Sequence, residues 1–129
     1  MNDTIRHQWT LPNGLRVVGE LLPHLRTVSV GLWHHTGSML ETPEENGLSH
    51  FIEHMVFKGT ETRTARQINE EMDEVGGSMN AFTGKDSTCF YAKVIDEDLP
   101  LAIDLLADLS IHATLDDAEL QKERGVILE

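Results

Sequence analysis

With 129 residues, 40% of them hydrophobic, the chain can form one domain, or part of a larger one, around a single core. Its formal net charge of −12 argues against binding to nucleic acid or to an anionic membrane surface, because both require a basic face. Only one cysteine is present, so no internal disulfide can form. The sequence shows neither the apolar stretch of a signal peptide nor the roughly 20 apolar residues of a membrane span, and we therefore expect a cytoplasmic protein.

The first half of the chain is expected to form two strands followed by two helices. Asn13-Gly14 favours a tight hairpin turn, because both residues accept positive φ angles. The second strand is indicated by alternating apolar and polar residues, and the second helix by a capping box that begins at Thr64. The predicted elements are strands over 15–22 and 27–33 and helices over about 47–57 and 64–75.

The second half repeats the same order of elements. Two strands are expected on either side of a turn at residues 84–86, and Pro100 suits the first turn of the helix that follows. The predicted elements are strands over 78–83 and 87–95 and helices over about 100–112 and from about 116 onward. The order ββααββαα predicts an α+β fold in which helices pack on one side of a mostly antiparallel sheet.

The helix predicted over 47–57 carries three residues that suit a metal site. His50 and His54 are four residues apart, so their rings lie one helical turn from each other and can reach a single ion. Glu53 lies beside them but out of register with the pair, where it can act on water instead of binding the metal. The opposite face carries a predicted apolar stripe, made of Leu48, Phe51, Ile52 and Met55. The alternative is that the two histidines are simply solvated side chains.

At this point the sequence resembles a known family. His50-Phe51-Ile52-Glu53-His54 is the His-x-x-Glu-His signature of the inverzincin metallopeptidases. The flanking sequence is similar to the pitrilysin/insulinase family, in particular its processing-peptidase-like branch. The matching segments are 11–15, 46–49, 55–60, 76–77, 80–83 and 123–128.

The resemblance implies a zinc site and a place for the substrate. It makes His50 and His54 ligands of one zinc ion, Glu53 the general base, and Glu123 a supporting acid near the metal. It also implies that a peptide binds as an added strand along one edge of a sheet. The residues of this edge strand would be Gly77, Ser78, Met79, Asn80, Ala81 and Phe82. The alternatives are that Glu123 is a solvated helix acid and that residues 77–82 form an ordinary sheet strand.

The chain departs from the family pattern at its C-terminal end. The family's third zinc ligand, a glutamate, would fall at position 130, one residue beyond the chain. Glu129 is a poor substitute, because one residue turns a helical side chain by about 100°. We therefore expect residues 1–129 to be the N-terminal part of a longer metallopeptidase domain. The resemblance also implies a second homologous domain or subunit.

The function implied is that of a zinc-dependent endopeptidase acting on peptides or unfolded proteins, with the 129-residue piece itself inactive. Two alternatives remain open. One is a non-catalytic scaffold subunit of the same fold, and the other is a plain metal-binding or peptide-binding module.

Overall fold

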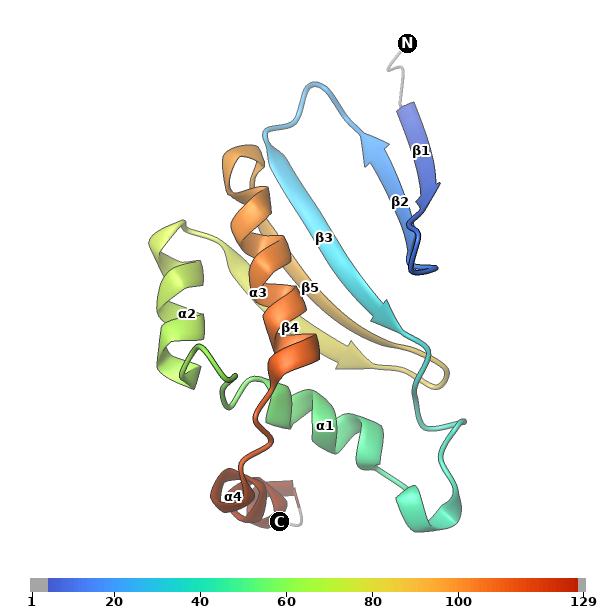
Figure 1. The fold of residues 1–129 in the computed structure, drawn as a ribbon, viewed down its shortest axis with the longest axis vertical. Helices are drawn as coiled ribbons and strands as arrows, with labels where there is room; N and C mark the ends of the chain where they lie inside the picture. The colour runs from blue at the N-terminus through green and yellow to red at the C-terminus, as the bar shows by residue number, and fades with distance from the viewer. Residues whose placement is uncertain (1–4, 128–129) are drawn as a thin grey trace.

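The computed structural model describes residues 5–127 and confirms the α+β class (Figure 1). The strands are β1 (Ile5–Thr10), β2 (Arg16–Leu21), β3 (Thr27–His34), β4 (Ser78–Thr83) and β5 (Thr88–Ile95). The helices are α1 (Leu48–Val56), α2 (Ala65–Glu74), α3 (Leu99–His112) and α4 (Asp117–Ile127), with 3-10 turns η1 (Pro43–Glu45) and η2 (Asp96–Asp98). Strand β1 is an addition to the predicted order, so that three strands precede the first helix pair.

The strands form two antiparallel sheets. Strands β1 and β2 pair with each other as a hairpin, and its turn uses Gly14 at a φ of +87° as the Asn-Gly signal predicts. The other sheet has the order β3-β5-β4, with β5 in the middle and β4 along one edge. Among residues 5–127, this order leaves one side of the strand predicted to bind substrate without a paired strand.

The core lies between the three-stranded sheet and α3, which crosses one face of that sheet in Figure 1. Central strand β5 alternates buried and exposed residues over its second half, and its buried side chains meet the leucines of α3. The buried cluster consists of Val56, Met72, Phe90, Ala92, Val94, Ala102, Leu105 and Leu106. Each large side chain in it contributes about 1.5–3 kcal/mol through burial.

Helix α1 is buried differently from its predicted stripe. Met55 is almost fully buried, but Leu48 and Ile52 are 45% and 40% exposed. The prediction of one buried stripe is therefore wrong for these two residues, and Ser49 and Val56 are buried in their place. The reason is that α1 does not lie flat on the sheet: it lies beyond the end of the sheet, between β4 and α4 (Figure 1).

Candidate metal centre

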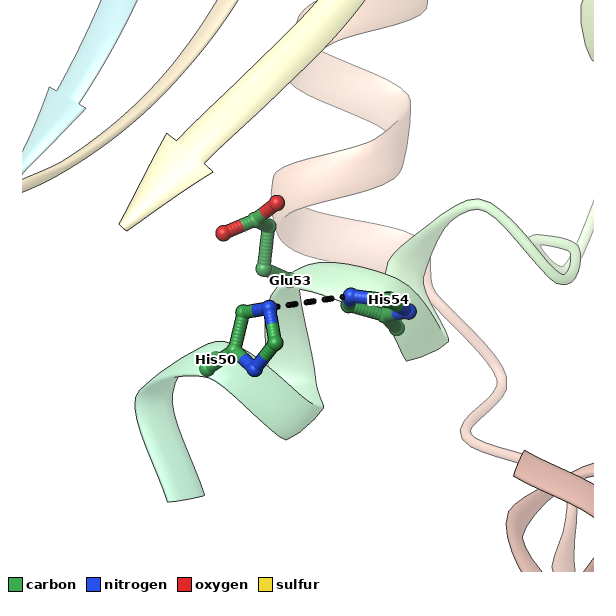
Figure 2. Close-up of side chains that lie close together, drawn as sticks. All are labelled: His50, Glu53 and His54. Atoms are coloured by element: carbon green, nitrogen blue, oxygen red, sulfur yellow. Dashed lines mark hydrogen bonds between the residues drawn. The ribbon is translucent and has the colours of Figure 1, made fainter. Parts of the chain in front are cut away.

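His50 and His54 project from one side of α1 and meet at their ring nitrogens (Figure 2). The two Nε2 atoms are 3.1 Å apart, and the rings are nearly perpendicular, at 80°. A carboxylate oxygen of Glu53 completes the group, with all three potential ligand atoms within 4.8 Å of one another. The helix therefore brings together the three residues that the sequence pattern singled out.

This arrangement fits a zinc ion. Two nitrogens that bind a tetrahedral zinc at 2.0–2.1 Å lie about 3.3 Å from each other, close to the distance between the two rings. Imidazole nitrogen is also a ligand type that zinc prefers. The side chain of His54 is 36% exposed and His50 is exposed, so an ion can reach both nitrogens without the helix moving.

Glu123 of α4 contacts the ring of His54 at the nitrogen that does not face His50. Its carboxylate accepts a hydrogen bond from Nδ1 of His54 at 2.7 Å and another from the Nζ of Lys58 at 2.9 Å. Because Nδ1 donates its proton to the carboxylate, Nε2 of His54 is the nitrogen that keeps the lone pair, as a metal ligand must. The structure thus places Glu123 against the predicted site.

Glu123 is also charged and almost completely buried. Only 6% of the residue is exposed, which is incompatible with a solvated helix acid. The hydrogen bond from Lys58 and then that from His54 lower the pKa of Glu123, and together they outweigh the opposing effect of burial. Lys58 was missed by the sequence analysis. Its position four residues after His54, just past the end of the helix, was the available signal.

Glu53 points away from the two rings, toward the end of β4 (Figure 2). The hydroxyl of Thr83, the last residue of that strand, donates a hydrogen bond to Oε2 of Glu53. Glu53 also lines an open cleft of about 450 Å³ together with His54, Lys58, Asn80 and Glu123. On another side it lines a cavity of about 150 Å³ bounded by Ser49, Thr88 and Ser110. No local sequence signal connects Thr83 with Glu53.

The predicted substrate strand corresponds to β4, with one correction at its start. Ser78, Asn80 and Phe82 are exposed, whereas Met79 and Ala81 pack against the core. Gly77 lies before the strand and has a packing role, because a Cβ there would come within 2.4 Å of the Met72 sulfur. The prediction that concerns Glu129 and a glutamate at position 130 lies outside the described residues.

Known proteins resemble this chain in sequence and in fold. The chain is 53% identical over 122 residues to uncharacterized zinc protease YmxG of Bacillus subtilis, covering 95% of the chain and 30% of that protein. It is 45% identical over 119 residues to a probable mitochondrial-processing peptidase subunit beta of Arabidopsis thaliana, covering 92% of the chain and 22% of that protein. A crystal structure of a protease from Helicobacter pylori superposes with a TM-score of 0.90 at 29% identity, over 96% of the chain and 30% of that structure.

The chain therefore spans less than a third of the length of each of these three proteins. The family model for insulinase, peptidase family M16, matches residues 16–129, which include every candidate site residue described above. The chain belongs to the insulinase family, peptidase family M16.

Proposed function

We propose that the protein containing this chain is a zinc-dependent endopeptidase that cuts peptides or unfolded proteins. The observation that carries the proposal is the pair of Nε2 atoms 3.1 Å apart on α1, with a carboxylate oxygen of Glu53 within 4.8 Å and edge strand β4 nearby. The names of the relatives, which include zinc proteases from bacteria, agree with this chemistry.

In the proposed mechanism, His50 and His54 hold one zinc ion, and Glu123 keeps His54 in the tautomer that binds metal. When bound, zinc polarises the scissile carbonyl and makes a water molecule more acidic. Glu53 accepts a proton from the attacking water and returns it to the departing amine, as a general base and then a general acid. Its position in the open cleft next to Asn80 suits this role.

We further propose that the substrate pairs with β4 as an added strand. An edge strand offers unpaired backbone N–H and C=O groups, which bind extended peptides with little regard for sequence. The exposed side chains of Ser78, Asn80 and Phe82 would then contact alternate substrate residues. Only an unfolded segment can adopt this geometry, so folded proteins would be poor substrates.

Residues 1–129 are proposed to be the N-terminal part of a longer metallopeptidase domain, which works with a second homologous domain or subunit. One relative is named as a subunit of a processing peptidase, which supports a two-part arrangement. Over residues 5–127, no helix is both long enough and apolar enough to cross a membrane. A cytoplasmic location remains a prediction from sequence.

The alternative is a non-catalytic scaffold or peptide-binding subunit of the same fold. A non-catalytic subunit needs no general base, so under this alternative the wild-type protein and a Glu53 variant would show the same hydrolysis. The complete His50, Glu53 and His54 group favours the catalytic reading.

The test is Glu53→Gln in the full-length protein. An amide cannot accept the proton, so hydrolysis of an unstructured peptide should fall by about 10²–10⁴-fold, the usual contribution of a general base. Zinc content should stay at one ion, because Glu53 is not proposed as a ligand. The matched control is Glu74→Gln, an exposed acid at the end of α2, which should leave turnover unchanged. Near-normal turnover by the Glu53 variant would overturn the assignment.

A further inference from the structure

We infer that Thr83 positions the Glu53 carboxylate for proton transfer and thereby connects the proposed substrate strand to the proposed base; this inference rests on the proposed function. The hydroxyl of Thr83 donates to Oε2 of Glu53 across 30 residues of sequence. Thr83 is the last residue of β4, and Glu53 lies near the middle of α1. The bond therefore joins the two elements that carry substrate binding and chemistry in the proposed mechanism.

Glu53 needs such a partner because its side chain has few other constraints. Within the described part of the chain, the Thr83 hydroxyl is its one side-chain hydrogen-bond donor. Glu53 is half-buried between an open cleft and a small cavity, so several orientations of the carboxylate are sterically available. With Oε2 occupied by Thr83, the other carboxylate oxygen is left for the reacting water. Fixing a reactive group in one orientation is a recognised source of rate enhancement.

Thr83 is itself held by a rigid turn, so it can act as the fixed partner of the pair. It pairs with Thr88 at the closed end of the β4–β5 hairpin, where Gly84 N–H donates to the Ser87 carbonyl at 2.8 Å. The loop after β3 braces this turn, because Met39 N–H donates to the Lys85 carbonyl at 2.8 Å. Gly37 permits the close approach, since a Cβ there would lie 2.6 Å from the Gly84 carbonyl oxygen.

Strand β4 also connects the proposed substrate-binding residues with the residue that orients the Glu53 carboxylate. Asn80 of β4 and Glu53 line one cleft, and Thr83 lies three residues further along the strand. A peptide that pairs with β4 would lie along the strand whose last residue holds the base. Positioning by Thr83 is then expected to affect turnover more than substrate binding, because its contact is with the base and not with the peptide.

The experiment compares Thr83→Val and Thr83→Ser in the full-length protein. Valine has nearly the shape of threonine but cannot donate, whereas serine keeps the hydroxyl. For Thr83→Val we expect kcat to fall by about 10- to 100-fold, the effect of losing a hydrogen bond to a charged group, with KM changed by less than about threefold. Thr83→Ser should retain most of kcat. Adding Thr83→Val to Glu53→Gln should cause no further loss, because the residue acts through the base.

Two further measurements do not depend on activity. Calorimetry should give the same zinc affinity for wild type and for Thr83→Val, and a crystal structure of Thr83→Val should show the Glu53 carboxylate turned from its wild-type orientation. Thr27→Val, at the exposed start of β3, is a control for the loss of a strand hydroxyl.

The inference is overturned if Thr83→Val keeps the wild-type kcat, if valine and serine cause equal losses, or if valine weakens zinc binding. Failure of the proposed function looks different: wild type and Glu53→Gln would then hydrolyse peptides equally or not at all. In that case the crystal structure still decides whether Thr83 orients Glu53.

Discussion

At the scale of single residues, the candidate centre depends on which hydrogen-bond partner each carboxylate oxygen and each ring nitrogen has. Glu123 uses one oxygen for Nδ1 of His54 and the other for the Nζ of Lys58. Its negative charge is thus shared between the ring that would bind metal and the side-chain nitrogen of Lys58. A buried carboxylate with two such partners stays ionised and holds the ring in place.

Glu123→Gln should therefore weaken zinc binding without abolishing it. The amide has the same shape, but it brings no negative charge and its oxygen can face only one of the two donors. Loss of such an outer partner typically reduces metal affinity by about 10–100-fold. Calorimetric titration of the metal-free protein measures this directly. Glu119→Gln, one turn earlier on α4 and paired with exposed Lys122, is the control that should bind zinc normally. Unchanged affinity in the Glu123 variant would remove Glu123 from the metal site.

At the scale of elements, one carboxylate connects α3 to the segment that follows α1. Asp108 of α3 accepts hydrogen bonds from the Thr60 hydroxyl at 2.7 Å, Arg63 Nη1 at 2.9 Å and His112 Nδ1 at 3.0 Å. Arg63 extends the network to Glu71 of α2. Two helices, α2 and α3, are thereby joined through the segment between α1 and α2.

The ionisation of Asp108 follows from this network. Burial alone would raise its pKa, but the hydrogen bonds from Thr60, Arg63 and His112 outweigh burial and lower the pKa below its ordinary value. A lowered pKa means that Asp108 stabilises the fold at every pH above its unfolded-state pKa of about 3.9. The contribution is lost as the pH falls from there through the folded-state pKa.

Asp108→Asn should thus destabilise the protein by roughly 3 kcal/mol at pH 7, because Arg63 and His112 lose their buried partner. The difference from wild type should shrink below about pH 4, where wild type begins to lose the same contribution. Urea unfolding at both pH values measures this. Asp104→Asn is the control: Asp104 pairs with the same arginine, but its side chain is 64% exposed, so the loss should be under about 1 kcal/mol. Equal losses for the two variants would contradict a special role of Asp108.

At the scale of the whole molecule, what the 129 residues can do by themselves depends on which parts of the proposed site they contain. They contain the two proposed histidine ligands, the proposed base and the proposed substrate strand, and they span 30% of the bacterial relative YmxG. Zinc enzymes normally use three protein ligands, and the third is expected at position 130. A second homologous domain, which would hold the peptide over the metal, is also expected elsewhere.

The 129-residue chain alone should consequently bind zinc weakly and hydrolyse no peptide. Two imidazoles compete poorly with water and buffer for the ion, and among residues 5–127 no carboxylate is proposed as a third ligand to balance its charge. Calorimetry at neutral pH, beside a form extended by several dozen residues, provides the comparison. Tight binding of one ion by the short chain, equal to that of the extended form, would mean that Glu129 or another group already completes the site.

Much of this protein follows from local sequence patterns. The spacing of His50, Glu53 and His54 on a helix determines that their side chains lie close together, because helical geometry relates residues three and four apart. Alternation and turn residues likewise predicted β3, β4 and β5, and capping predicted α2. The edge strand Ile5–Thr10 was not predicted. It contains His7 and Trp9, but it is exposed throughout and depends on pairing with β2.

Only the tertiary structure decided which distant residues meet. The family resemblance implied that Glu123 lies near the metal, but no periodic pattern encodes its contact with His54 across 69 residues or that of Thr83 with Glu53 across 30. The order β3-β5-β4 likewise depends on chain topology, and it alone makes β4 an edge. The exposure of Leu48 and Ile52 has the same origin: a hydrophobic stripe indicates that a helix face can be buried, but the neighbours it meets are determined by the packing of the whole chain.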